Sequence, residues 1–225
     1  MGQALGNVLP LAVAVAIFPV PIIAVVLMVG SDRGRAKGLA FVLAWSGGLA
    51  AVAAIVLGVG GVADARDAGE PAAWANVLLL ALGLLALVGA ARQWRGRPPA
   101  GKETPVPGWM RAIDDFTIAK AGGSGFALSA LNPKNVLLTV AAGVEIAEVG
   151  LPPSQQVVVV FVFVLIASVG VMAPLVLSLA LGERSRELLD GLRGWMTRNS
   201  AVIMSVLFLL IGAKLIGDAL SGFSR

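Results

Sequence analysis

Four consecutive residues, Asn132-Pro133-Lys134-Asn135, interrupt a long apolar stretch of the chain. A helix from Gly122 to Val149 would place Lys134 roughly 18 Å along its axis, near the middle of a hydrocarbon layer about 30 Å thick. A lysine at that depth costs about 3 kcal/mol or more, and the proline removes a backbone hydrogen bond. Such residues are tolerated where they face protein or a wet cavity. Since an ammonium and amides bind anions without covalent chemistry, we predict an anion-binding substrate site here.

The composition is that of an integral membrane protein. Hydrophobic residues make up 58% and charged residues 13% of the 225 residues, and the mean hydropathy is +0.90. Soluble proteins average about half apolar and a quarter charged residues. The chain has no Cys and no His, which removes disulfides, thiolate nucleophiles and the usual zinc motifs. We therefore expect no enzyme, no catalytic residue, no metal and no cofactor.

Six stretches are long enough to cross a bilayer, which predicts an all-α membrane protein. They lie near residues 5–30, 38–62, 73–91, 122–149, 156–181 and 200–220. Basic residues gather in alternate connections: thirteen of seventeen lie within 33–37, 92–120 and 184–198. The positive-inside rule then predicts a multi-pass protein of the cytoplasmic membrane with both termini outside. Because position explains the net charge of +4, no nucleic-acid partner is expected.

Each half of the chain contains three spans, so the second half must cross the membrane in the opposite sense. We predict two inverted-topology three-helix repeats, residues 1–97 and 121–225, joined by a cytoplasmic linker and interfacial helix at 98–120. Residues 109–116 and 186–198 both show amphipathic patterns typical of helices in the headgroup layer. Small residues are expected to line the contacts between spans, among them Gly47, Gly48, Gly89, Gly170 and Gly212.

The first helix of each repeat is expected to be broken. Pro19 and Pro21 interrupt the first span, as Asn132–Asn135 interrupt the fourth. A helix that restarts after a proline presents free N–H groups and the positive end of its dipole. Two such restarts beside Lys134 favour an anion. We therefore add Pro19 and Pro21 to the predicted substrate site, and expect the Asn132 and Asn135 amides to donate to the anion.

Other polar residues have two interpretations each. Glu145 near the outer end of span four is expected to be solvated, with a role in proton coupling as the alternative. Asp114 and Asp115 can cap the approach to span four or meet Lys120, or they can form a gate. Lys214 and Asp218, four residues apart, are expected to pair locally.

The motif Asn132-Pro133-Lys134, together with the Pro-Val-Pro break and the basic loop at 30–38, resembles the lysine-exporter (LysE) superfamily. The longer run Leu128–Asn135 and the segment Trp109–Thr117 resemble a narrower branch, the GAP-family and sulfolipid-addressing proteins of actinobacteria. This resemblance implies a six-span inverted-repeat exporter and a role in moving surface lipids outward. Amino-acid exporters of the superfamily tend to carry Pro-Gly-Pro where this chain has Pro19-Val20-Pro21.

The favoured hypothesis is a secondary transporter that exports or flips an anionic amphiphile by alternating access. Its partners would be membrane lipids and the amphiphile. Two copies of the chain could also assemble as a homodimer. One alternative is an exporter of a small amino acid or organic anion. The other is a non-transporting scaffold for lipid synthesis or export, which would leave the buried Lys134 without a role.

Overall fold

The computed structural model describes residues 1–64, 73–97, 112–113 and 115–223, all of whose regular elements are helical. The elements are α1 (Gly2–Ala16), α2 (Pro19–Gly30), α3 (Gly34–Asp64), α4 (Ala73–Arg95), α6 (Ile118–Phe126), the π-helix η1 (Ala127–Leu131), α7 (Pro133–Glu148), α8 (Pro153–Leu181), the 3₁₀ turn η2 (Gly182–Arg184) and α9 (Ser185–Phe223). The linker predicted at 98–120 lies largely outside the described residues.

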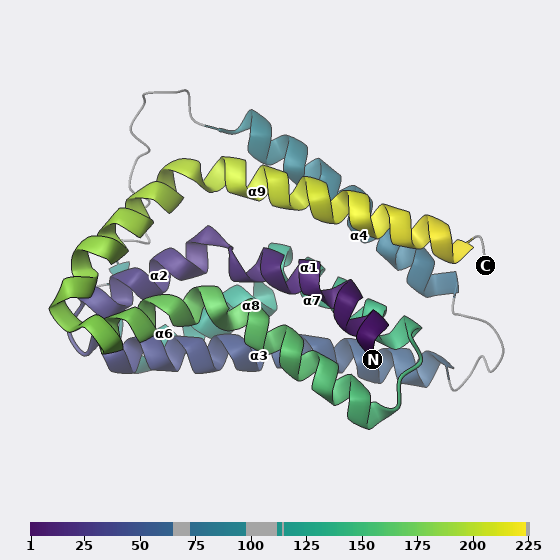
Figure 1. The fold of residues 1–225 in the computed structure, drawn as a ribbon, viewed down its shortest axis with the longest axis horizontal. Coiled ribbons are helices and arrows are strands. Elements are labelled where there is room, and N and C mark those ends of the chain that lie inside the picture. The colour runs from purple at the N-terminus through teal and green to yellow at the C-terminus, as the bar shows by residue number, and fades with distance from the viewer. Residues whose placement is uncertain (65–72, 98–111, 114, 224–225) are drawn as a thin grey trace.

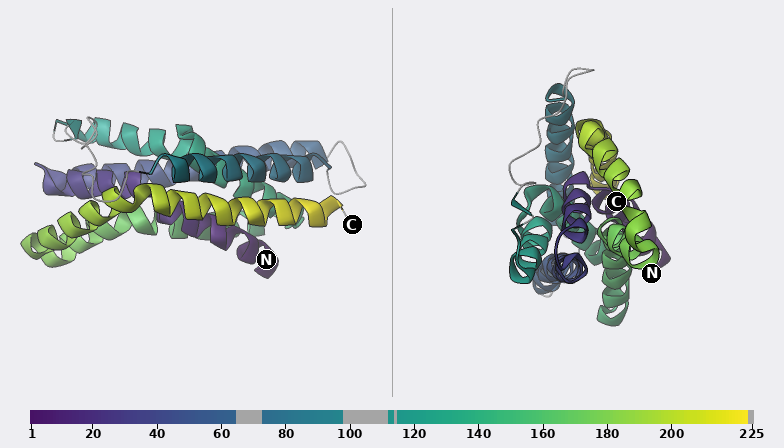
Figure 2. Two further views of the ribbon diagram at one scale, coloured as in Figure 1. Left: turned by 90° about the horizontal axis from the view of Figure 1, so that it is seen from above. Right: turned by 90° about the vertical axis from the view of Figure 1, so that its left-hand side faces the viewer.

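The helices run side by side along the long axis of an elongated bundle (Figures 1 and 2). Both termini lie at one end, which we call the terminus end. At the opposite end the chain turns from α8 into α9 through η2 (Figure 1). We call this the hairpin end; the turn between α2 and α3 also lies there.

Apolar side chains cover much of the outside, as expected for helices in lipid. Leu43, Ile55 and Phe161 are each more than 60% exposed. Three stretches are long and apolar enough to cross a membrane, namely Gly34–Val59, Asn76–Arg95 and Pro153–Phe223, and the bent pair α1–α2 adds a fourth. The third stretch contains two helices, α8 and α9, on either side of η2, and α6 and α7 are too short to qualify singly.

Both predicted helix breaks are present. The axes of α1 and α2 differ by 50°, and Phe18 between them is extended, with φ −65° and ψ 117°. Asn132 takes the same conformation, with φ −74° and ψ 119°, immediately before α7. Each of these residues precedes a proline, and the proline ring disfavours the helical conformation in the residue before it.

Small residues allow close helix contacts at four of the five glycines that we expected to line them. A Cβ at Gly170 would overlap the Ala16 carbonyl oxygen, and one at Gly48 would overlap Ser129 of η1. Gly89 and Gly212 likewise lie against neighbouring helices. Gly47 is the exception, because a Cβ at this residue would have no atom within 4 Å. It is exposed because it lies on the outer side of α3.

Two serines join α3 and α8 across their contact. The hydroxyl oxygens of Ser46 and Ser168 are 2.9 Å apart, and Ser168 is buried. Ser46→Ala should destabilise the protein by about 0.6 kcal/mol, the average for interhelical hydrogen bonds in membranes. Unfolding by SDS in mixed micelles measures this change, with Ser205→Ala as control because the Ser205 hydroxyl donates within α9. If Ser46→Ala cost no more than the control, the interhelical bond would contribute nothing.

The segment 186–198 is not the separate interfacial helix that its pattern predicted. It forms the first part of α9, which continues without interruption to Phe223. Leu189 and Met196 are buried, whereas Leu188 and Trp195 are more than half exposed. The predicted apolar face is therefore divided between the protein interior and the outside, because α9 packs on α2 along one side.

Candidate functional site

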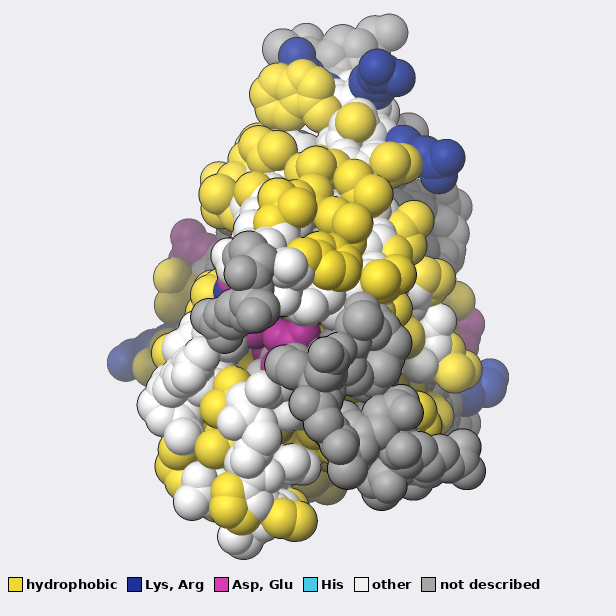
Figure 3. Space-filling model, turned by 90° about the vertical axis from the view of Figure 1, so that its right-hand side faces the viewer, with side chains coloured by type: hydrophobic (Ala, Val, Ile, Leu, Met, Phe, Trp, Pro, Cys, Tyr) yellow, Lys and Arg dark blue, Asp and Glu magenta, His cyan; other side chains and the backbone are white. Residues whose placement is uncertain are grey.

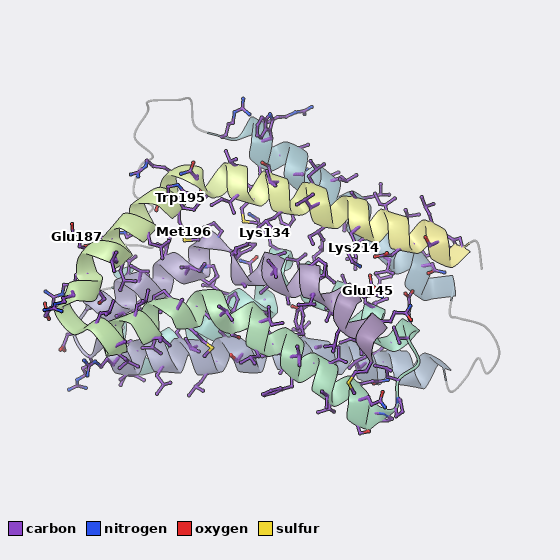
Figure 4. The ribbon with its side chains drawn as sticks, viewed as in Figure 1. Lys134, Glu145, Glu187, Trp195, Met196 and Lys214 are labelled. Carbon is purple, nitrogen blue, oxygen red and sulfur yellow. The ribbon has the colours of Figure 1, made fainter. Side chains whose placement is uncertain are left out.

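Lys134 lies in the first turn of α7, in the middle of the bundle between α9 and the α1–α2 break (Figure 4). Its Nζ atom is 5.7 Å from the ring centre of Phe18, which is the residue at that break. It is 5.8 Å from the ring centre of Phe208 on α9. The two predicted breaks are thus adjacent, and the lysine of one contacts the residue at the other.

The surroundings of Lys134 are apolar and aromatic. Phe18 and Phe208 are 2% and 5% exposed and share a hydrophobic cluster with Met204 and with Ala86 and Ala90 of α4. A cation within about 6 Å of an aromatic ring gains about 0.5–2 kcal/mol, less than the charge loses on leaving water. Lys134 is half-buried, and no acidic side chain of the described residues pairs with its amine.

The two asparagines both bond to the backbone at the break. The Asn132 side-chain oxygen accepts from the Lys134 N–H at 3.1 Å and so caps α7. The amide nitrogen of Asn135, a fully buried residue, donates to the Leu128 carbonyl of η1 at 2.7 Å. The cap uses the side-chain oxygen of Asn132 and not its amide nitrogen. The two asparagines hold the break in shape, and Lys134 alone supplies the charge.

The prolines start helices at both breaks. Pro19 and Pro133 occupy the first position of α2 and α7, where a missing N–H costs nothing. Pro21 is buried in α2.

Three buried polar atoms of the described residues lack a hydrogen-bond partner: Asn135 Oδ1, Thr139 Oγ1 and Trp45 Nε1. Two of them belong to the first turns of α7, and unsatisfied buried polar atoms are uncommon in folded proteins.

Glu145 is not solvated, contrary to our expectation. It is 1% exposed, and its carboxylate accepts from Asn7 Nδ2 of α1 at 2.7 Å and from Lys214 Nζ of α9 at 2.8 Å. Lys214 also pairs with Asp218, as predicted. This cluster, Asn7–Glu145–Lys214–Asp218, lies toward the terminus end (Figure 4), and acidic side chains are visible at the centre of that end (Figure 3). The burial follows from the packing of α7 against α1.

Sequence reasoning missed the partners Phe18, Phe208, Asn7 and the Glu145–Lys214 pair. Phe18 was detectable, since it directly precedes the first proline of the break. The pairing of Glu145 with Lys214, 69 residues apart, leaves no local signal. The one indication in the sequence is that an acid and a base lie near the predicted outer ends of the predicted fourth and sixth spans.

The hairpin end carries two clefts. The larger one, of about 1080 Å³, lies between the end of α2, the start of α3 and the α8–α9 turn. The smaller one, of about 490 Å³, lies between the α2–α3 turn and the start of α6, and Asp115 lines it. Asp115 is exposed. Asp114 lies outside the described residues.

Among the described residues, no three His, Cys, Asp or Glu side chains gather in a metal-binding group.

Comparison with known proteins supports the narrower of the two resemblances. Neither the curated proteins nor the solved structures gave a match. A family profile described as Sap, sulfolipid-1-addressing protein (SfLAP), matches residues 8–221. Since this match covers nearly the whole chain, the protein belongs to the SfLAP family.

Proposed function

We propose that this membrane protein exports or flips an anionic amphiphile, a lipid whose headgroup carries a sulfate or a similar anion, by alternating access. The observation that carries the proposal is Lys134, an ammonium among buried aromatic rings without an acidic partner in the described part of the chain. A charge of this kind inside a membrane protein is costly and is kept where it binds a substrate or an ion. An anionic headgroup would supply the missing counter-charge.

The family supports the substrate class. The SfLAP description names sulfolipid-1, and a sulfolipid combines an anionic sulfate with apolar tails. The tails of such a lipid need not enter the polar site, since they can remain in the bilayer beside it. Lys134 has to accept only the headgroup.

We further propose six crossings arranged as two inverted repeats, in which α1, α2, α3 and α4 correspond to α6, α7, α8 and α9. The helix contacts support this correspondence. α1 packs on α8 as α6 packs on α3, and α2 contacts α8 and α9 as α7 contacts α3 and α4. The helices α4 and α9, which correspond to each other, pack along their length. Inverted repeats with broken helices at the midplane are typical of secondary transporters, and the LysE superfamily that the motifs resemble implies the same architecture.

The charge distribution supports placing the hairpin end in the cytoplasm and both termini outside the cytoplasmic membrane. Thirteen of the seventeen basic residues lie in connections that this orientation puts inside. A monoanion moving outward then gains about 2.3 kcal/mol per 100 mV of inside-negative potential. Export therefore requires no cofactor and no chemical step.

The cluster around Glu145 is proposed as the outer gate. It connects α1, α7 and α9 at the terminus end through Asn7, Glu145 and Lys214, whereas both clefts lie at the opposite end. In the proposed orientation, this arrangement supports a state in which the outer side of the transporter is closed. Opening to the outside would separate these three helices, and Asp115 at the smaller cleft is proposed as part of the inner gate.

The proposal is tested with full-length protein in phosphatidylcholine vesicles that contain fluorescent sulfatide. Lys134→Ala should slow sulfatide movement between leaflets by about tenfold or more, since a 1.4 kcal/mol loss of binding is a factor of ten. Lys134→Arg should retain more activity than Lys134→Ala. The control is Lys120→Ala, which removes an exposed lysine at the start of α6.

Wild-type rates for Lys134→Ala would overturn the site. In a second arm, vesicles are loaded with a radiolabelled amino acid in place of sulfatide. Faster loss than from protein-free vesicles would favour the exporter of small amino acids, and no transport in either arm would favour the scaffold.

A further inference from the structure

The larger cleft at the hairpin end has an apolar wall, which could contact the apolar part of an amphiphile. Val26, Leu27 and Val29 of α2 form an apolar side together with Leu189 of α9. The volume of about 1080 Å³ slightly exceeds the usual range for ligand sites, about 300–1,000 Å³. A headgroup and the first part of an acyl chain fit in a space of this size.

The charged residues of the cleft are predominantly basic. Four arginines line it, Arg33, Arg35, Arg186 and Arg193, against the acids Glu183 and Asp190. Glu183 is engaged by Arg186 at 2.9 Å. The other three arginines make no ion pair within the described residues. Positive charge thus remains in excess, in a concave site where the field of several cations adds up.

The arginine-bearing turn has a defined conformation. Arg33 has φ +53°, which is uncommon for a residue other than glycine. The turn is held by Ser31, whose hydroxyl donates to the Met28 carbonyl at 2.8 Å and accepts from Lys37 Nζ at 3.0 Å. A side chain at Gly34 would overlap the carbonyls of Met28 and Val29. The backbone that carries Arg33 and Arg35 is therefore preorganised, and on binding a ligand would have to order only their side chains.

Helix α2 connects the cleft to the site at the helix breaks. Its C-terminal residues line the cleft, and its N-terminal residue Pro19 follows Phe18, which contacts Lys134. A headgroup bound at the arginines would thus lie at one end of the helix whose other end reaches Lys134. A lipid source is favoured over a free anion because the apolar side of the cleft would have no role with sulfate or phosphate alone.

We propose that this cleft is a second binding site, in which Arg33, Arg35 and Arg193 capture the sulfate or phosphate headgroup of an anionic lipid from the inner leaflet before the lipid reaches Lys134. The capture step rests on the proposed export function. The binding itself does not depend on transport, so the two can fail separately.

The test measures binding of fluorescent sulfatide to the full-length protein in nanodiscs of phosphatidylcholine. Arg35→Gln with Arg193→Gln should weaken binding by about tenfold, as expected for losing charge-assisted hydrogen bonds. The matched control is Arg184→Gln with Arg198→Gln, which removes the same charge at the same end of the molecule but outside the cleft. This control should change binding by less than about twofold, because exposed charges are screened by salt.

Equal weakening by both double variants would overturn the proposal in favour of general surface charge, and no weakening would overturn it outright. Uncharged galactosylceramide that binds as well as sulfatide would also overturn it, as would inorganic sulfate that binds as tightly as the lipid. If the double variant fails to fold, Arg193→Gln alone should still weaken binding more than Arg198→Gln. Lys134→Ala should retain binding in the cleft while losing transport, which separates failure of this site from failure of the proposed function.

Discussion

Replacing Lys214 with methionine should lower the free energy of unfolding by about 3–5 kcal/mol, the range for removing one partner of a buried ion pair. The Glu145 carboxylate is 1% exposed, and Lys214 is its cationic partner at 2.8 Å. Without the ammonium the carboxylate keeps only the Asn7 amide as a donor and lies close to a second acid, Asp218. SDS-induced unfolding in mixed micelles measures the change.

The control is the double variant Lys214→Met with Glu145→Gln. It removes the buried negative charge together with its partner, and the side-chain carbonyl of the introduced glutamine can still accept from Asn7. Its stability should return to within about 1–2 kcal/mol of wild type, since a buried pair removed as a whole is often nearly neutral. If the single variant were as stable as wild type, Glu145 would not depend on Lys214. In that case the proposed outer gate would lose its physical basis.

The helix breaks and the special environment of Lys134 could be predicted from the sequence because proline and lysine are both unfavourable within an apolar helix. A proline within an apolar stretch and a lysine at mid-depth are costly wherever they occur, so their presence required a special environment. The structure provides that environment in Phe18 and Phe208. The identity of these two aromatic partners depends on how the helices pack and could not be read locally, apart from the adjacency of Phe18 to Pro19.

The capping role of Asn132 could also have been predicted from the sequence. Asparagine followed by proline is a helix N-cap pattern, in which the side-chain oxygen accepts a backbone N–H and proline occupies the first helical position. Asn132 does this.

The burial of Glu145 and the structure of residues 186–198 depend on tertiary contacts. Near a helix end, solvation is the default for a carboxylate, and only the approach of α1 and α9 buries this one. Similarly, the amphipathic pattern at 186–198 is compatible both with a separate surface helix and with the first turns of α9. The pattern of one segment cannot decide between them, because residues that cover Met196, such as Ile22 and Ile23, lie elsewhere in the chain.

A second large effect on stability is expected from Gly170→Ala. The added methyl group would overlap the carbonyl of Ala16, the last residue of α1, and it also approaches Ile22 of α2. Because a backbone atom cannot rotate away, α1 and α8 would have to separate beside the first helix break. We expect a loss of about 3 kcal/mol, at the upper end of the usual cost of overpacking, measured by SDS-induced unfolding.

Gly47→Ala is the matched control, since it adds the same methyl group in the middle of α3, where no atom lies within 4 Å. It should leave stability unchanged or raise it by up to about 1 kcal/mol, the difference in helix propensity between glycine and alanine. Sulfatide transport by Gly170→Ala should also fall, because the displaced end of α1 leads directly to Phe18 and from there to Lys134. A Gly170→Ala protein as stable and active as Gly47→Ala would show that α1 and α8 are not in close contact at this point.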